Sequence, residues 1–379
     1  MKYLVLLSLL STLALTSCNK YSEGPNFTLL TRKARISNDW VLESYTKDGT
    51  DLYDATYEMN LSIEKDGTFT VNYSEAEPLV DVNLFPFFPP FIKTHWHKTI
   101  HKRELVEEKV VTGWDDPRMP TISGLRRRGD TPASIRTFSE TAGISKRDNV
   151  TDVALLEHCI KDDLNKTAPR VMAVLNPVKL IITNYPEGKE EWLTAENNQE
   201  DESAGFREVP FSREIYIEQE DFKEEANKKF FRLKLGSEVR LKNAYIIKGE
   251  SVVKDETGNI TEIHCTYDEN SLSGSGTEAS KRKVKGTLHW VSIKHAIKAE
   301  VRVYDRLFTD EAPDSYKDTN FKEFLNPESL TIIEAFVEPS LKTANVLDRF
   351  QFQRLGYFCV DKDTTNDKLV FNRTVPLRD

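Results

Sequence analysis

The sequence predicts a mainly β protein with a small α-helical subdomain, in which β-barrels follow a truncated β-meander. Three observations support this fold class. Short alternating runs separated by Gly, Asn and Pro turns recur over residues 178–360, a spacing typical of barrels. Apolar residues recur at helical spacing over residues 153–164. Near the amino terminus, alternating runs surround Asp66-Gly67, a strong two-residue hairpin signal.

Length and composition are those of an ordinary globular protein. The chain has 379 residues, enough for two or three domains of about 100–200 residues each. Its 39% hydrophobic and 30% charged residues exclude wholesale disorder. The formal net charge of -9 does not point to nucleic-acid binding by the molecule as a whole. Basic residues nevertheless gather in one stretch without acidic residues: Lys281, Arg282, Lys283, Lys285, Lys294 and Lys298.

The amino terminus resembles a bacterial lipoprotein signal. Lys2 precedes an apolar run, residues 3–15, which is shorter than the ~20 residues of a membrane-spanning helix but suits a secretory signal. Leu15-Thr16-Ser17-Cys18 resembles the lipobox, in which small residues flank the cut and the cysteine receives the lipid. The resemblance implies a signal peptide over residues 1–17, lipidation of Cys18, and a membrane anchored through its acyl chains.

Residues 18–76 are expected to form the truncated β-meander. Residues 40–45 and 58–64 alternate as strands do, and Asp66-Gly67 leads into a third strand over residues 68–73. The tryptophan-led first strand and the hairpin resemble the lipocalin-like lipoproteins of gut-type bacteria. A small barrel closes with about eight strands, so three strands leave its pocket incomplete.

Residues 77–103 are expected to be a junction. Residues 84–91 are apolar but contain three prolines, which remove ladder donors and exclude a central strand. We interpret the nearby His95, His97 and His101 as linker histidines and expect no metal site. The four cysteines lie far apart without a Cys-x-x-Cys pair, so neither structural zinc nor a disulfide framework is indicated.

Residues 104–379 are identified as a member of a different family. Gly113-Trp114-Asp115-Asp116-Pro117-Arg118 is followed closely by Gly124-Leu125-Arg126-Arg127-Arg128-Gly129. Both runs resemble the segment that follows the ATP-binding signature loop in glutaminyl-tRNA synthetases, which are class I aminoacyl-tRNA synthetases. The resemblance covers about seven-tenths of the chain and implies the C-terminal, anticodon-binding half of that family.

Residues 104–169 are expected to form the helical subdomain, which contacts the inner tRNA stem in this family. Thr131 suits the cap of a helix, and Pro132 suits its first position. A second helix follows from the apolar spacing over residues 153–164. Three consecutive arginines have two roles that stay open, a solvated helix end or contacts with tRNA phosphates. They are Arg126, Arg127 and Arg128.

After residue 169 the pattern changes to strands. In glutaminyl-tRNA synthetases this region forms two antiparallel β-barrels that grip the anticodon, one inserted in the other. The resemblance therefore implies a proximal barrel of residues 170–226 with 298–379, and a distal barrel of residues 227–297. Strands are expected over residues 178–183, 214–218, 238–248, 260–267, 286–291, 299–304, 330–336 and 351–360.

Reading unstacked anticodon bases requires cations toward phosphates, polar groups toward base edges and aromatic faces for stacking. Lys242 stands where the family has arginine, Phe231 where it has lysine, and Asp130 where it usually has tyrosine. We assign Asp130 no function. The family's anticodon-contacting positions carry over to Arg170, Arg232, Arg240, Lys242, Gln351 and Arg354.

No catalytic residues are expected, and whether the chain is an enzyme stays open. None of the histidines forms the family's His-x-Gly-His turn. His101-Lys102-Arg103 lies too close to Leu105 to end the mobile loop that holds pyrophosphate. The intact family uses ATP and Mg, but no cofactor is expected for this chain, nor aminoacylation by it alone.

The favoured interpretation is recognition of the glutamine tRNA anticodon, tRNA(Gln), by the C-terminal half of a glutamine-tRNA ligase. Two alternatives stay open: an exported lipocalin-like lipoprotein with a binding function, and a chimeric chain joined near Arg103. The synthetase half predicts a cytoplasmic location, and the leader predicts a membrane-anchored lipoprotein. The expected partners are tRNA(Gln) and, through Cys18, a membrane.

Overall fold

The chain divides into two compact units, Met1–Asn83 and Leu84–Asp379, and each is described by itself. The predicted leader with Cys18 and the junction residues His95 and His97 lie outside the described residues. The computed structural model describes residues 39–41, 46–47, 50–51, 59–63, 69–73, 99–143, 151–227, 229–313, 315–316 and 318–377.

The first unit contains the predicted hairpin. β4 (Met59–Ile63) and β5 (Phe69–Tyr73) pair antiparallel, and β1 (Asp39–Val41) pairs antiparallel with the other edge of β4. These three strands confirm the predicted ones. A separate ribbon, which the sequence did not predict, joins β2 (Thr46–Lys47) to β3 (Thr50–Asp51). The resemblance of this unit to lipocalin-like lipoproteins stays a prediction.

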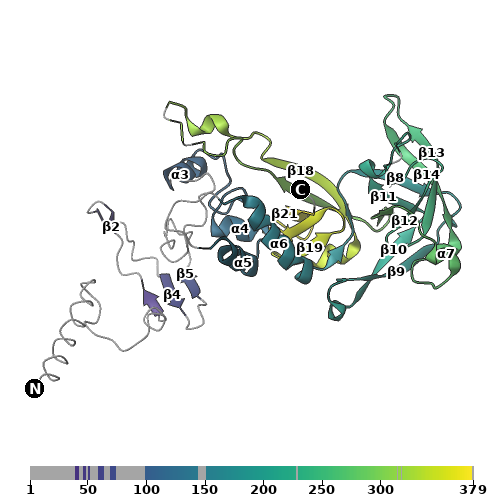
Figure 1. Cartoon of the computed structure of the whole chain (residues 1–379), viewed down its shortest axis with the longest axis horizontal. Helices are drawn as coiled ribbons and strands as arrows, with labels where there is room; N and C mark the ends of the chain where they lie inside the picture. Colours follow the sequence, from purple (N-terminus) through teal and green to yellow (C-terminus); the bar gives the residue numbers. More distant parts are fainter. Residues whose placement is uncertain are drawn as a thin grey trace, which may run out of the picture. The chain divides into compact units, whose positions relative to one another are not determined.

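Two curled seven-stranded sheets make up most of the second unit (Figure 1). In the first sheet the strand order is β15-β12-β13-β14-β8-β11-β16. Its strands are β8 (Pro177–Ile182), β11 (Glu214–Glu218), β12 (Glu238–Leu241), β13 (Ile246–Lys254), β14 (Ile260–Asp268), β15 (Thr287–Leu288) and β16 (Val291–Ser292). Beside it is a two-stranded ribbon of β9 (Glu190–Glu196) and β10 (Phe206–Ser212).

The second sheet has the strand order β6-β19-β20-β21-β17-β18-β7. Its core brings together the apolar side chains of Val301, Phe352, Phe358 and Phe371, which are fully buried. The strands are β6 (Arg170–Val171), β7 (Ala173–Val174), β17 (Ile297–Tyr304), β18 (Leu330–Val337), β19 (Arg349–Phe352), β20 (Gly356–Val360) and β21 (Leu369–Pro376).

The mainly β architecture is confirmed, but the expectation of purely antiparallel sheets is wrong. β8 runs parallel to β14, β12 to β15, β17 to β21, and β6 to β19. Each of these pairs joins strands that are far apart in the sequence. No hairpin turn connects them, so nothing local imposes the antiparallel direction that a tight turn requires.

Sheet pairing divides the chain differently from the expected limits at residues 226 and 298. β8 and β11 pair within the first sheet, together with β12, β13 and β14. Leu180 and Ile215 are fully buried in the same core as Val239 and Ile263. The segment inserted between β7 and β17 therefore begins near residue 175 rather than at 227, because these apolar faces share one core.

Two predicted strands are each broken by a turn with left-handed backbone. The predicted run 238–248 is interrupted at Asn243, with φ 58°, and the run 351–360 at Arg354, with φ 70°. Asparagine tolerates this conformation better than most residues, whereas arginine adopts it rarely. Strands β6, β7, β9, β10 and β21 were not predicted from the sequence.

Helix α5 (Pro132–Ala142) begins at a capping residue, Thr131, as predicted. Its hydroxyl accepts the Ser134 N–H at 3.0 Å, the Ser134 hydroxyl accepts the Thr131 N–H at 3.2 Å, and Pro132 follows at the first position. The predicted helix over residues 153–164 is confirmed as well, and it buries Ile160 and Leu164 against β20 and β21. The α-helices are α3 (Thr99–Glu107), α4 (Ile122–Arg128), α5 (Pro132–Ala142), α6 (Val153–Thr167) and α7 (Glu278–Lys281). Short 3-10 helices span Glu202–Ala204, Gln219–Asp221, Glu269–Ser271, Phe321–Phe324 and Pro339–Thr343.

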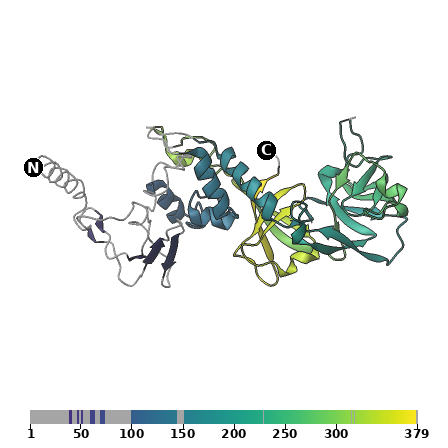
Figure 2. The ribbon, with the colours of Figure 1, turned by 60° about the horizontal axis from the view of Figure 1, so that its bottom comes forward.

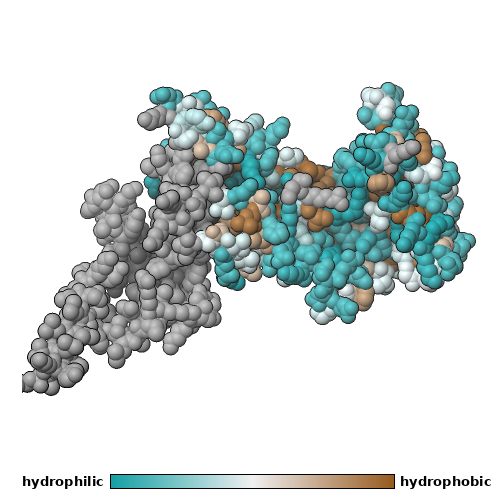
Figure 3. All heavy atoms as spheres, in the orientation of Figure 1, coloured by the Kyte–Doolittle hydropathy of each residue, from teal (hydrophilic) through white to brown (hydrophobic). Residues whose placement is uncertain are grey.

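Within the second unit, the second sheet lies between helices α4–α6 and the first sheet, as two views agree (Figures 1 and 2). The described surface in Figure 3 is mainly hydrophilic, with separate apolar areas. Among the described residues, none of the helices combines the length and apolarity needed to cross a membrane.

Candidate nucleic-acid interface

A polar hollow of about 390 Å³ is lined by side chains from both sheets of the second unit. Four of the six predicted anticodon residues line it, and they come from β6, the end of β12, β19 and the turn after β19. Three of these four are cations, and none of the eight lining residues is acidic. The lining residues are Arg170, Gln199, Lys242, Thr287, His289, Gln351, Gln353 and Arg354.

Arg170 and Gln351 are register partners on the parallel strands β6 and β19. The Arg170 guanidinium donates to neutral side chains, to Gln199 Oε1 at 3.1 Å and to Asn165 Oδ1 at 3.0 Å. The Gln351 amide Nε2 donates to the Tyr357 hydroxyl at 2.8 Å. Both side chains are therefore held by uncharged groups, so the positive charge of Arg170 is only weakly compensated, by Glu200 at 3.8 Å.

Arg354 is oriented by two side chains from outside the second sheet, Asp221 and His289. Its two terminal nitrogens donate to both carboxylate oxygens of the buried Asp221, at 2.5 and 2.7 Å. Its Nη1 also lies 3.1 Å from His289 Nδ1. Arginine can only donate, so this nitrogen of His289 accepts and the proton of the neutral imidazole sits on Nε2. That N–H faces Glu218 Oε1 at 3.3 Å.

Lys242 is a half-buried cation of the hollow. It follows the last residue of β12, in the turn that Asn243 makes possible. Burial is the main cause that lowers the pKa of its ammonium group, and the nearby Arg170 and Arg207 lower it further against the opposing effect of Glu196. Its partly desolvated charge is therefore unfavourable in the free protein, and an anion placed beside it would relieve that cost.

Arg232 and Arg240, the other two predicted residues, do not line the hollow. Arg232 borders it, because its Nε lies 3.3 Å from the same Asp221 carboxylate that holds Arg354. Arg240 is directed elsewhere and donates to the carbonyl oxygens of Ser271 at 3.0 Å and Ser280 at 2.8 Å. These contacts hold the segment around α7 in place, so Arg240 stabilises a loop in this structure.

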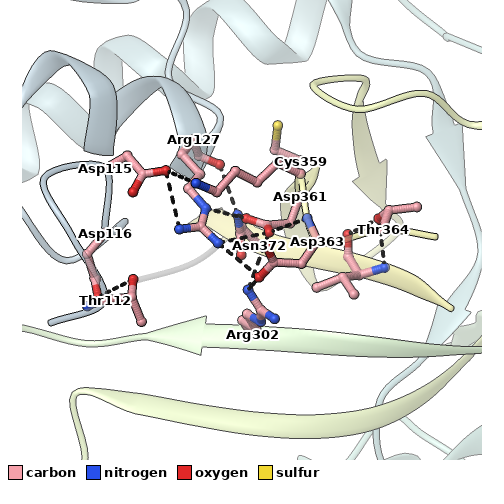
Figure 4. Close-up of polar contacts among 12 residues, drawn as sticks. Thr112, Asp115, Asp116, Arg127, Arg302, Cys359, Asp361, Asp363, Thr364 and Asn372 are labelled. Carbon is pink, nitrogen blue, oxygen red and sulfur yellow. Dashed lines mark hydrogen bonds and ion pairs between the residues drawn. The ribbon is translucent and has the colours of Figure 1, made fainter. Parts of the chain in front are cut away.

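The three consecutive arginines of α4 lie in three different environments. Arg126 is exposed, and Arg128 donates to the Thr374 carbonyl at 3.0 Å. Arg127 is buried against β20 and β21, where its Nε and Nη2 donate to Asp361 at 2.8 and 3.0 Å and Nη2 also donates to Asp363 at 3.0 Å (Figure 4). Neither of the two roles left open from the sequence fits Arg127, because carboxylates of the protein itself saturate its donors.

The Asp115-Asp116-Pro117-Arg118 signature is part of the same polar region. The Asp115 carboxylate faces Arg127 Nη1 at 3.4 Å. Asp116 is buried and accepts the Thr112 N–H at 2.9 Å (Figure 4). It also accepts two donors of Arg118 at 2.8 and 3.0 Å. The signature thus folds the turn before α4 and joins that helix to the second sheet.

Burial raises the pKa of the Arg127 partner Asp361 in principle, but the net shift is downward. Hydrogen bonds from Arg127, the Asp363 N–H and Asn372 outweigh desolvation and lower the pKa of Asp361 to about 2. The pKa of Asp130, which follows the C-terminal end of α4, shifts in the opposite direction. Asp130 is fully buried, its Oδ1 has no hydrogen-bond partner, and desolvation raises its pKa to about 7.

Sequence reasoning missed the residues that support the hollow. Gln199, Thr287 and His289 lie in segments where no family position was carried over, and Asp221 is one of several acidic residues in the run 218–225, none of which stands out. Gln353 carried a usable signal, because residues two apart on a strand face the same side and Gln351 had been selected.

Three family models match the chain in order. Residues 88–166 match the catalytic domain of class I tRNA synthetases (E and Q). Residues 168–268 and 287–361 match two models of the anti-codon binding domain of the same synthetases.

The chain is also similar to curated proteins named glutamine-tRNA ligase. It is 59% identical to that of Rhodopirellula baltica over 277 residues, 73% of this chain and 46% of the relative. The relative from Proteus mirabilis is 60% identical over 276 residues, 73% of this chain and 49% of its own length. That from Clostridium perfringens is 55% identical over 277 residues, 73% and 50% of the two chains. The chain therefore spans about half the length of the curated relatives it matches.

Proposed function

Because residues 104–379 belong to the glutaminyl-tRNA synthetase family as its C-terminal, anticodon-binding half, we propose that this chain binds tRNA(Gln) through the polar hollow. The observation that carries the proposal is the convergence of Arg170, Lys242, Gln351 and Arg354 on one space. These residues lie as much as 184 positions apart in the sequence (354 − 170), yet they share one cavity of about 390 Å³.

The hollow offers two of the three kinds of contact that reading of single-stranded RNA requires, namely cations for phosphates and polar groups for base edges. Arg170, Lys242 and Arg354 supply positive charge for phosphates, and the burial of Lys242 increases the gain from pairing it with an anion. The amide of Gln351 uses one N–H for Tyr357, which leaves its other N–H and its carbonyl oxygen for a base edge. An unstacked base is read in this way by amide groups that can both donate and accept.

The remaining parts of the unit have proposed roles that follow from the family. We propose that the two curled sheets correspond to the two anticodon-gripping barrels, and the sheet pairing supports limits between them near residues 175 and 296. The helices α4 to α6 correspond to the subdomain that contacts the inner tRNA stem. Arg126, which is exposed on α4, is the proposed phosphate contact there. Glutaminylation is proposed only as the reaction that this tRNA binding serves.

Binding of purified full-length chain to tRNA(Gln) tests the proposal. We expect an affinity that falls steeply with salt, with a slope of about 0.7 in log–log form for each single-stranded phosphate contact. Replacing anticodon bases should weaken binding, whereas changes in the variable loop should not. Arg354→Gln removes a charged donor and should weaken binding by roughly tenfold or more, since hydrogen bonds to charged groups contribute about 1.5–3 kcal/mol.

Arg213→Gln is the matched control for Arg354→Gln. Arg213 is a partly exposed arginine of the same unit, lies outside the lining of the hollow, and has one weak ion pair to Glu187 at 4.0 Å. Arg213→Gln removes one positive charge, as Arg354→Gln does, and should change the affinity for tRNA(Gln) less than twofold. Binding that is insensitive to salt, or equal for tRNA(Gln) and anticodon-altered tRNA, would contradict the proposal.

The lipid anchor is a separate proposal about location. If Cys18 is lipidated, the full-length chain expressed in a bacterium with a lipoprotein pathway should incorporate labelled fatty acid and sediment with membranes. Cys18→Ser should abolish both. Labelling that persists in Cys18→Ser would rule out this anchor, and long reads across the codons for residues 95–114 would test the alternative of a chimeric chain.

A further inference from the structure

Phe231 is an exposed aromatic residue whose exposure has no explanation in the packing of the fold. Half of its surface, 52%, is open to solvent, although it lies one residue from Arg232 and two from the fully buried Leu233. Lys285 holds its ammonium nitrogen 5.5 Å from the centre of the Phe231 ring. A cation over an aromatic face is an attractive arrangement, and both partners are exposed.

The backbone on both sides fixes the place of this pair beside the hollow. A Cβ on Gly286 would lie only 2.3 Å from the Phe231 carbonyl oxygen, so the two segments are in direct contact and need glycine there. The next residue, Thr287, lines the hollow. Arg232 shares the Asp221 carboxylate with the lining residue Arg354. The backbone of Phe231 is therefore held near the hollow by two independent connections.

On the side of Phe231 formed by residues 281–298, the charge favours a polyanion. Lys283 and Lys285 are exposed, and they belong to the stretch of residues 281–298 that has no acidic residue. Bases of a single strand stack on aromatic side chains while neighbouring cations contact its phosphates. If Phe231 instead packed against an apolar surface of a protein partner, the flanking Lys283 and Lys285 would find no anionic group there.

We propose that Phe231 and Lys285 form a stacking platform for one unstacked nucleobase of the RNA strand whose phosphates enter the hollow. Phe231 supplies the ring face, and Lys285 contacts the adjacent phosphate from above the ring. The platform rests on the proposed function and adds a contact that the six carried-over residues do not include. It also explains how phenylalanine is accommodated where the family has lysine: a stacking contact replaces a charged one.

Substitutions at Phe231 in the full-length chain separate stacking from simple apolar burial. Phe231→Ala should weaken tRNA(Gln) binding at least about fivefold, since stacking on one aromatic contributes ~1–3 kcal/mol, or roughly 5- to 150-fold. Phe231→Leu keeps the apolar bulk without the ring and should lose nearly as much. Phe231→Tyr keeps the ring and should bind within about twofold of the parent.

Salt dependence distinguishes the two members of the platform. Loss of stacking removes no ionic contact, so Phe231→Ala should leave the salt slope unchanged. Lys285→Gln should lower the slope by about 0.7, the contribution of one single-stranded phosphate. Trp192→Ala is the matched control, because Trp192 is an aromatic of similar exposure, 54%, on β9 and outside the lining of the hollow. It should bind like the parent.

The outcomes separate this proposal from the proposed function. If the parent binds and Arg354→Gln weakens binding while Phe231→Ala binds like the parent, the platform is overturned and the hollow stands. Phe231→Leu binding as tightly as the parent would likewise overturn stacking in favour of an apolar contact. If the parent shows no anticodon-dependent binding, the proposed function fails and the platform fails with it. Because Phe231 is exposed, unchanged melting temperatures should verify that each variant is folded.

Discussion

Arginines in two regions of the second unit have opposite surroundings. In the cluster between α4 and the second sheet, Arg127 is enclosed by Asp361, Asp363 and Asp115 (Figure 4). In the hollow, Arg170 is held by the neutral Asn165 and Gln199, and its nearest carboxylate lies 3.8 Å away. The cluster is thus electrically compensated from within. In the hollow, Asp221 compensates Arg354, whereas Arg170 keeps a positive charge that its neighbours compensate only weakly.

The difference separates a structural role from the proposed binding role for the same residue type. A buried ion pair whose donors are all used has nothing left to offer a ligand, and removing one partner leaves the other charge uncompensated. A cation held by neutral groups keeps its field for an incoming anion. The sequence Arg126-Arg127-Arg128 does not reveal which arginine has a structural role, because the acidic residues that bind Arg127 are Asp361 and Asp363.

The largest expected effect is the loss of stability on breaking the cluster. Arg127→Met leaves Asp361 buried without its main partner and should lower the free energy of unfolding by about 3–5 kcal/mol. Urea denaturation of the full-length chain measures it. Arg126→Met, on the same helix but exposed, should stay within about 0.5 kcal/mol of the parent. Equal effects of the two substitutions would show that the cluster does not stabilise the fold.

The cluster's neighbour Asp130 should reverse the usual pH dependence of a carboxyl group. Its folded-state pKa is raised to about 7, mainly by burial, with Glu157 acting in the same direction and Arg128 and Arg349 opposing. Between its unfolded value of about 3.9 and 7 the folded state therefore binds the extra proton. The contribution of Asp130 to the free energy of unfolding is therefore fully present below about pH 4. It falls by about 1.4 kcal/mol per pH unit as the pH rises from there to 7.

Asp130→Asn removes this titration and sharpens the contrast with Asp361, whose lowered pKa acts in the opposite direction. The melting temperature of Asp130→Asn relative to the parent should increase from pH 5 to about pH 7 and level off above it. Asp361 instead contributes stability above its unfolded pKa of about 3.9 that is lost as the pH falls toward 2. A difference between Asp130→Asn and the parent that does not depend on pH would disprove the Asp130 assignment.

A smaller effect is expected from loosening the support of Arg354 in the hollow. His289→Leu removes the acceptor 3.1 Å from Arg354 Nη1, which should weaken tRNA(Gln) binding by roughly 2- to 10-fold, the equivalent of one hydrogen bond of about 0.5–1.5 kcal/mol. His289→Gln retains an acceptor and a donor and should restore most of the affinity. Full affinity in His289→Leu would mean that Asp221 alone orients the guanidinium.

Sequence alternation predicted most strands of the second unit but not the turns that interrupt them. Residues 238–248 and 351–360 read as continuous strands, because their apolar residues keep strand spacing. Left-handed backbone at Asn243 and Arg354 breaks both runs. Those two turns place Lys242 and Arg354 in the hollow, so the errors in the strand prediction fall on the candidate site itself.

Arg240 and Lys242 show why two neighbouring candidate tRNA-binding residues lie in different surroundings. Both were carried over from the same family motif, and they are two residues apart. Arg240 lies within β12 and reaches the carbonyls of Ser271 and Ser280, whereas Lys242 lies past the strand's end and enters the hollow. Residue type and spacing could select both, but only the end of β12 at Leu241 decides which side chain turns toward the hollow.

The sequence by itself determined the properties that depend on short segments. The cap at Thr131, the hairpin between β4 and β5, the mainly β character and the family membership are all expressed within a few residues or within motifs. The tertiary structure alone decided the parallel strand pairs, the limits of the inserted sheet, and which cations stay available to a ligand. These depend on contacts between residues as much as 234 positions apart, as for Arg127 and Asp361, and no local spacing records which distant carboxylate will meet a given arginine.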